Sequence, residues 1–280
     1  METNLSVSLV LVTPEVAKNY LRYNNKNRHP SINHIAFLTK EMNQDRFLEN
    51  GESIVFDKNG QLKDGQHRLL SIIKSGKSYF IPIVRGVEPI AMSTYDTGKN
   101  RSPADVLTLN GFKNTNKITA LIISIDRYSN KKSKSGNFIS GMNRGDRLTN
   151  QQVLEYCEEN YDWLKDIVSS VTNISKNNKP SVLPNTKIGL IAYILGGENP
   201  KPEVYDFLKH LTGAARTPET ATGYIYNKLH NAVINKEPLN FYWILGMSIK
   251  AYNYFIDGNP SVKYFKFSVN QELPNINKIQ

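Results

Sequence analysis

The sequence predicts an α+β domain over residues 1–107, followed by an all-α domain over residues 108–280. Two observations support this division. In the first domain, short apolar runs, turn signals and helical patterns alternate. From Ser102 onward, capped helical patterns follow one another, and no linker composition separates them cleanly from the first domain. A chain of 280 residues is long enough for one large domain or two modest ones.

The first elements follow from cap and breaker signals. Residues 5–12 alternate loosely between apolar and polar side chains, which predicts a strand. Thr13 offers a capping hydroxyl before a proline and an acid, so a helix is expected from there to about Asn24. His29 precedes a proline and cannot stay helical, and Ser31 then opens a second helix.

A hairpin is expected next. Residues 53–63 hold an apolar run, the turn signal Asn59-Gly60 and a second extended stretch, which ends at Gly65. The elements expected after it are a helix over residues 67–75, a strand over residues 79–85 and a short extended piece over residues 93–95. Because Pro82 interrupts its strand, we expect that strand at an edge of the sheet.

The second half is expected to be helical. Thr149 and Gln152 form a capping box before one of its helices. The helices are expected over residues 103–109, 116–127, from 149 onward, 187–195, 202–212, 220–233 and 239–255. The aromatic residues of the last helix have the spacing of a core-facing stripe. A short strand over residues 262–267 is expected to return to the first domain.

Composition narrows the class of protein. The mean hydropathy is −0.45, and no apolar run approaches the roughly 20 residues of a membrane span, so no membrane association is expected. The N-terminus is interpreted as a strand, because it lacks the basic region and cleavage site of a signal peptide. Cys157 is the only cysteine, which excludes a disulfide within the chain and favours a reducing cytoplasm. Acidic neighbours would raise its pKa, so a structural role is expected.

A net charge of +10 favours a polyanionic partner. Much of this charge falls in residues 127–147, a glycine-containing segment that is expected to form a long loop between helices. The residues expected to contact nucleic acid are Arg127, Lys131, Lys132, Lys134, Arg144 and Arg147. Such a loop is suited to following a phosphate backbone, and a plain surface insertion is the alternative left open.

The turn Asp64-Gly65-Gln66-His67-Arg68 has the chemistry of a phosphate site. Gly65 permits a backbone geometry that other residues resist, and the first-turn N–H groups of the following helix favour anions. His67 and Arg68 add two directed donors, and arginine can bind phosphate in a bidentate way. His67 can also act as a general acid or base. The alternative is an ordinary helix start with Asp64 as its cap.

Two further polar clusters are candidates for the same site. Asn24, Asn27 and Arg28 lie in the loop after the first helix. Asp96, Arg101 and Ser102 lie in a second turn that leads into a helix, which would be another anion cradle. Asp96 could bind Mg²⁺ through water or orient Arg101, and an ordinary turn cap is the alternative. No histidine has metal-ligand spacing with His67, so no metal site built from side chains is predicted.

The five-residue turn resembles the signature of the ParB/sulfiredoxin-like superfamily, where regulators of DNA sulfur modification carry the same DGQHR letters. The chain is more similar still to a group of uncharacterised phage and prophage ParB-like proteins. The residues that carry this resemblance are Thr13 to Glu15, Asn24, Asn27, Arg28, Asn50, Gly51, Ile54 to Asp57, Asp64 to Leu69, Ser75, Gly76, Val84 to Gly86, Asp96 to Gly98, Arg101, Ser102, Ala104 to Leu107 and Ile249 to Asn253.

The resemblance implies a ParB/sulfiredoxin-like fold for the first domain. It also implies that Gly65, His67 and Arg68 bind nucleotide phosphates, while Asp64 and Gln66 shape the turn. Function stays open, because this superfamily includes nucleotide switches, kinases, reductases and DNA binders. The chain departs from ParB proper, which has Glu-Arg-Arg after the glycine, and that leaves cytidine-nucleotide specificity open. It also lacks a cysteine near the turn, which excludes the reductase chemistry of sulfiredoxin.

We therefore expect a phage-type cytoplasmic protein that binds a nucleotide at the turn and contacts DNA. The residues expected to form the phosphate site are Asn27, Arg28, Asp64, Gly65, Gln66, His67, Arg68, Arg101 and Ser102. Whether it is an enzyme is left open. Hydrolysis or phosphoryl transfer would use His67, Asp96 and Mg²⁺ bound with a nucleoside triphosphate. The alternatives are a non-enzymatic DNA-binding regulator and a structural or host-takeover protein with a vestigial site. A homodimer is also left open.

Overall fold

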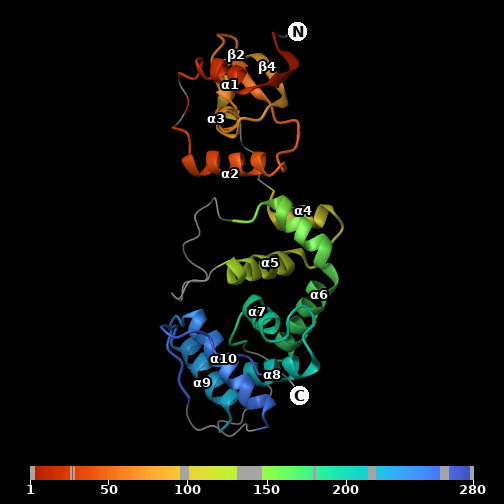
Figure 1. Ribbon diagram of the computed structural model, residues 1–280, viewed down its shortest axis with the longest axis vertical. Coiled ribbons are helices and arrows are strands. Elements are labelled where there is room, and N and C mark those ends of the chain that lie inside the picture. Colours follow the sequence, from red (N-terminus) through yellow and green to blue (C-terminus); the bar gives the residue numbers. More distant parts are fainter. Residues whose placement is uncertain are drawn as a thin grey trace. The chain divides into compact units, whose positions relative to one another are not determined.

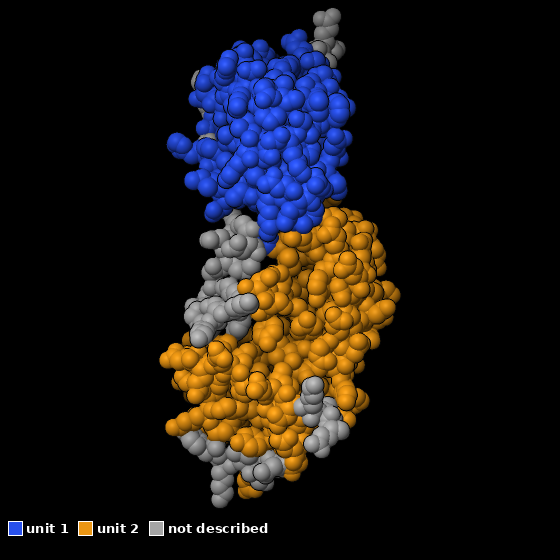
Figure 2. Space-filling view, in the orientation of Figure 1, with its two compact units in different colours: residues 1–100, 142–147 blue, residues 101–141, 148–280 orange. Residues whose placement is uncertain are grey.

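The computed structural model describes residues 4–25, 27, 29–94, 101–130, 147–178, 181–213, 219–258 and 265–277. The chain divides into two compact units (Figure 2): unit 1 holds residues 1–100 and 142–147, and unit 2 holds residues 101–141 and 148–280. Each unit has its own hydrophobic core. Within the described residues there are one four-stranded sheet and ten α-helices (Figure 1), which confirms the α+β class.

The sheet of unit 1 has the strand order β1-β4-β2-β3. Its strands are β1 (Ser6–Val12), β2 (Ile54–Asp57), β3 (Leu62–Asp64) and β4 (Tyr79–Val87). β4 pairs antiparallel with β1 and parallel with β2, and β2 pairs antiparallel with β3. The prediction that Pro82 places its strand at an edge is therefore wrong. The proline is tolerated because the ladder between β4 and β2 begins only at Ile83.

The described part of unit 1 also contains three α-helices and the 3₁₀ helix η1 (Pro89–Thr94). The α-helices are α1 (Pro14–Leu21), α2 (Ile32–Asn43) and α3 (Gln66–Ser75). The predicted helix starts are confirmed, because Thr13 and Ser31 accept hydrogen bonds from the first turns of α1 and α2. The predicted extended piece is wrong for Ser93 and Thr94, which belong to η1, and Tyr95 lies outside the described residues.

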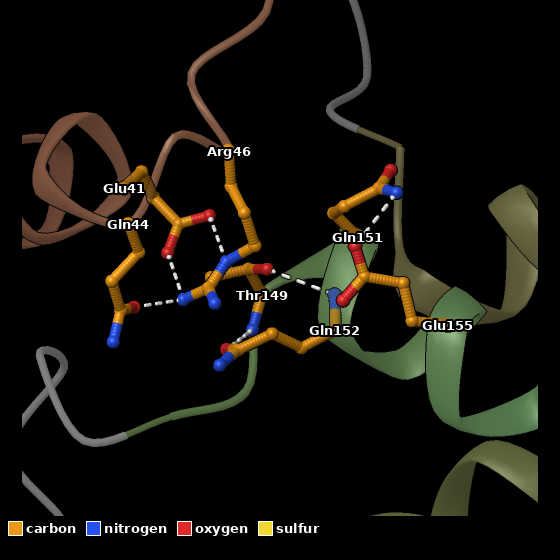
Figure 3. Close-up of polar contacts among 7 residues, drawn as sticks. All are labelled: Glu41, Gln44, Arg46, Thr149, Gln151, Gln152 and Glu155. Atoms are coloured by element: carbon orange, nitrogen blue, oxygen red, sulfur yellow. Dashed lines mark hydrogen bonds and ion pairs between the residues drawn. The ribbon is translucent and has the colours of Figure 1, made fainter.

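Two ion pairs anchor the loops of unit 1. After α2, Arg46 pairs with the buried carboxylate of Glu41 at 3.0 Å and also contacts Gln44 (Figure 3). In the β2–β3 turn, the buried carboxylate of Asp57 accepts two backbone N–H groups and pairs with Lys63 at 3.0 Å. The predicted hairpin is confirmed, and a buried acid rather than the turn residues alone organises it.

The described part of unit 2 contains seven α-helices, and its described residues 265–277 form neither helix nor strand. Its helices are α4 (Pro103–Leu109), α5 (Thr115–Asn130), α6 (Asn150–Asn177), α7 (Asn185–Gly196), α8 (Pro202–Thr212), α9 (Ala221–Ile234) and α10 (Phe241–Ile256). The predicted capping box of Thr149 and Gln152 opens α6 (Figure 3), where the two backbone–side-chain hydrogen bonds are 3.0 and 3.1 Å. A second capping box, formed by Ser102 and Asp105, opens α4.

The core of unit 2 confirms one sequence prediction and corrects another. The aromatic stripe of α10 is core, with Phe241, Tyr242 and Tyr252 all buried. The strand predicted over residues 262–267 is wrong in its described part, since Phe265 and Phe267 form no strand and pack into the core of unit 2. Residues 262–264 lie outside the described residues.

The structure also bears on the expected role of Cys157 and on the expectation about membrane spans. Cys157 is buried in α6, and burial, together with Glu158, raises the pKa of its thiol to about 11, which fits the expected structural role. Among the described helices, none is both long enough and apolar enough to cross a membrane.

Candidate functional site

Gly65 joins the hairpin to α3, and only glycine fits there. Its φ of 98° lies in the left-handed region that side chains rarely adopt. A Cβ on Gly65 would also lie 2.8 Å from Cγ1 of Ile54 and 3.3 Å from its Cα. As the N-cap of α3, Gly65 has no side chain to cap the helix. The start of α3 is thus held tightly against β2, and its positive end carries no side-chain cap from this residue.

Side-chain amides connect the loop after α1 to this turn. Asn24 donates to Oε1 of the buried Gln66 at 3.2 Å, and Asn27 donates to Oδ1 of Asn24. Asn27 also donates to the carbonyl oxygen of Leu62 at 2.9 Å. The Leu62 N–H in turn donates to the Tyr23 carbonyl at 2.9 Å. The structure therefore brings Asn27 and Gln66 together, two residues from separate clusters in the sequence.

His67 lies where α2 and α3 both begin. Its Nε2 accepts a hydrogen bond of 3.0 Å from the backbone N–H of Ser31, the N-cap residue of α2. Because this nitrogen accepts, the proton of the neutral ring belongs on Nδ1. The ring of His34 lies 5.0 Å from the ring of His67, measured between centroids, in an edge-to-face arrangement. One imidazole thus contacts the start of α2 while belonging to the first turn of α3.

Ser31 and His34 also belong to this site, although no motif in the sequence marks them as site residues. Both belong to the first turn of a capped helix, which is the signal that could have drawn attention to them. That signal shows where a helix begins, but it does not show which other helix begins beside it. Only the packing of α2 against α3 brings them to His67.

Arg68 makes its contacts within the protein. Its guanidinium donates to the Ser53 carbonyl at 2.8 Å and pairs with Asp64 and Glu52, each at 3.3 Å. Its side chain is only 12% exposed. A cavity of about 140 Å³ beside Arg68 is also lined by Glu49 and Glu52, whose charge disfavours a phosphate there. Arg68 and Asp64 are thus paired with each other, which is suited to holding the turn.

The other predicted site residues lie elsewhere in the chain or outside the described residues. Arg101 and Ser102 belong to unit 2. Ser102 forms the capping box of α4, and the Arg101 carbonyl accepts a hydrogen bond of 3.0 Å from Asn150. Arg127 lies in α5, and Arg147 lies three residues before α6. The predicted residues that lie outside the described ones are Arg28, Asp96, Lys131, Lys132, Lys134 and Arg144.

Comparisons with known proteins do not identify a family for this chain. No protein-family model matches the chain, and no curated protein matches it. A solved structure of a Pnob8-like ParB-N domain is similar over 84% of this chain and 99% of that chain, with 16% sequence identity and a TM-score of 0.23. With so low a TM-score, the likeness establishes neither the fold nor the function of this chain.

Proposed function

We propose that unit 1 binds a nucleotide phosphate where α2 and α3 begin, around His67. The observation that carries this proposal is the hydrogen bond from the Ser31 N–H to Nε2 of His67, because it joins two helix starts at one side chain. Each helix start carries a partial positive charge, and two together favour an anion more than one does. Gly65 adds to this, because its left-handed φ of 98° forms the tight turn into α3 and its missing side chain lets the start of α3 pack against Ile54.

The residues of the turn divide into two roles in this proposal. The first-turn amides of α3 and the imidazole of His67 contact the phosphate, whereas Arg68 and Asp64 hold the turn in shape. The amides of Asn27 and Gln66 fix the loop beside it. We propose Arg28, the residue after Asn27, as a further contact.

Mg²⁺ fits this site only as a companion of the nucleotide. The described residues of the turn supply N–H groups and an imidazole, and the carboxylate of Asp64 is already paired with Arg68. Within the described residues, no three metal-ligating side chains form a cluster. Bound Mg²⁺ would neutralise charge on the phosphates. We propose Asp96 as the residue that binds it through water, with His67 moving a proton if the nucleotide is hydrolysed.

A second candidate function is binding of DNA backbone at the same turn without turnover. The exposure of Ser31 and His34 favours it, because a phosphoryl-transfer site is usually shielded from water. The net charge of +10 also suits DNA. The residues proposed as additional DNA contacts are Arg127, Lys131, Lys132, Lys134, Arg144 and Arg147.

Calorimetric titration with a panel of nucleoside triphosphates, with and without Mg²⁺, tests the leading proposal. We expect at least one nucleotide to bind, and His67→Ala to weaken it. His210→Ala, in unit 2, is the matched control and should bind as wild type does. If no nucleotide binds and no phosphate is released, with or without DNA, nucleotide binding is wrong.

DNA titrations at several salt concentrations test the second candidate. We expect the logarithm of the affinity to fall steeply with the logarithm of the salt concentration. Reversing the charge of Lys131, Lys132 and Lys134 together should flatten this slope. An unchanged slope in the triple variant would show that DNA binds elsewhere on the protein. If no DNA binds at any salt concentration, the second candidate function is wrong.

A further inference from the structure

We propose that unit 2 contains a second ligand site, which binds a small organic anion with an aromatic or branched apolar body. The site is a cavity of about 410 Å³ whose lining residues come from α5, α7 and α10, together with the residue just before α7. That volume lies within the range of small-molecule sites in proteins. The proposal does not depend on the phosphate site of unit 1.

The walls of the cavity are mostly apolar. The apolar residues that line it are Ala120, Ile123, Pro184, Leu190, Phe241 and Leu245. Three residues with hydroxyl groups, Ser124, Tyr128 and Thr186, and two cations, Arg127 and Lys187, line it as well. None of the described lining residues is acidic. A few convergent polar groups in an apolar cavity are typical of a site that orients an amphipathic ligand.

The two cations lack a compensating negative charge within the described part of the chain. The ammonium of Lys187 lies 5.2 Å from the centroid of the Phe241 ring, and no described acid forms an ion pair with it. Burial partly desolvates the ammonium of Lys187 and so lowers its pKa. The Nε of Arg127 is buried and has no hydrogen-bond acceptor among the described residues. Such an arrangement costs stability, and a bound anion would offset that cost.

The start of α7 points to the same ligand charge. Pro184 is the N-cap residue of this 12-residue helix and provides no side-chain hydrogen bond to the first turn. Pro184, Thr186 and Lys187 all line the cavity, so the positive end of α7 borders it. A carboxylate and a phosphate monoester share the required chemistry. An inorganic ion alone would leave the apolar walls without a partner.

Calorimetric titration of the full chain with four probes tests the class of ligand. We expect benzoate or phenyl phosphate to bind and to raise the melting temperature, and which of them binds more tightly identifies the head group. Benzyl alcohol and inorganic phosphate should bind far more weakly, since each lacks one half of the proposed ligand. Equal binding of benzyl alcohol would overturn the role of the two cations. Equal binding of inorganic phosphate would overturn the role of the apolar walls.

Charge-removing variants test the place of the site. Lys187→Met and Arg127→Met should each weaken binding of the aromatic anion by roughly ten- to a hundredfold, as expected for a charge-assisted contact. Lys176→Met, an exposed position at the end of α6, is the control and should bind normally. His67→Ala should also bind normally, which separates this site from that of unit 1. Wild-type affinity in Lys187→Met would overturn the proposal.

A thermal measurement adds a readout that a structural role would not give. If Lys187 serves a ligand, Lys187→Met should melt at or above the wild-type temperature when no ligand is present, because a desolvated charge has been removed. A lower melting temperature would show that Lys187 stabilises the fold and would count against the site. Amide chemical shifts of Ser124 and Thr186 in the wild-type protein give a test that needs no variant. If benzoate and phenyl phosphate leave both unchanged, the site is wrong.

Discussion

The backbone N–H of Ser31 donates to Nε2 of His67 at 3.0 Å, so a residue that begins α2 is bonded to one in the first turn of α3. The two residues are 36 positions apart. The bond requires an unprotonated Nε2, because an imidazolium has no acceptor. Protonation of His67 would therefore break this contact between the two helices. The contact makes His67 both a structural residue and the centre of the proposed phosphate site.

Gly65→Ala should destabilise unit 1 by about 2 kcal/mol or more. A non-glycine residue at positive φ costs roughly 1–2 kcal/mol, and the new Cβ would also meet Ile54 at 2.8 Å. Urea unfolding measures the loss. Gly60→Ala is the matched control, because its φ is 75° and a Cβ there would meet nothing within 4 Å. If both variants lose the same stability, the contact with Ile54 costs nothing.

Arg68→Ala should also lower the free energy of unfolding, by about 1–3 kcal/mol. It removes the donor to the Ser53 carbonyl and leaves Asp64 and Glu52 without their partner. Arg68→Lys should rescue little, because an ammonium cannot reproduce the planar fork. Lys58→Ala is the control, since its pair with Glu88 is exposed and should matter little.

Arg68→Ala also tests the phosphate-binding role that the sequence predicts for Arg68. If Arg68 binds phosphate directly, Arg68→Ala should lower nucleotide affinity by roughly ten- to a hundredfold. Binding measured well below the melting temperature separates this effect from lost stability. A stable variant with normal affinity would confine Arg68 to holding the turn.

Local signals predicted most of the fold. The hydroxyls of Thr13, Ser31 and Thr149 each bond a backbone N–H three residues away, and such contacts depend only on nearby sequence. Two of the three errors in predicting extended structure concern neighbours distant in sequence. Pro82 was assigned to an edge, but the short β2 leaves room for a proline in a central strand. Phe267 belongs to an aromatic-rich stretch of sequence that is typical of a strand. Its ring packs against Gly246 of α10 instead, a contact that the local sequence does not reveal.

The candidate site was predictable only in part, for the same reason. The turn at Gly65 is contiguous, so its glycine and its helix start could be recognised from the sequence. The partners of Arg68 could not, because Glu52 and Ser53 lie on the far side of the hairpin. The meeting of His34 with His67 depends on how α2 packs on α3, which no local pattern reports.

Asp57 should make unit 1 sensitive to acid. Burial opposes its ionisation, yet hydrogen bonds from Gln61 and Asn59 and the Lys63 ammonium hold its pKa below the ordinary value. A carboxylate with a lowered folded-state pKa stabilises the fold above its unfolded pKa, about 3.9, and loses that contribution as the pH falls through the folded value. Between pH 6 and pH 2, the free energy of unfolding should therefore fall less in Asp57→Asn than in the wild-type protein. Equal slopes would contradict this.

His67→Ala separates an enzyme from a binding protein. If His67 only contacts a phosphate, the variant should lose affinity and any turnover in proportion. If it moves a proton, turnover should fall by roughly 10²–10⁴ while binding is largely kept. Phosphate release and calorimetric affinity, measured on the same samples, distinguish the two results. His67→Gln is the structural control, because its side-chain oxygen can still accept from the Ser31 N–H but it cannot act as a general base. Full turnover in His67→Gln would exclude proton transfer by His67 and leave it a role in binding alone.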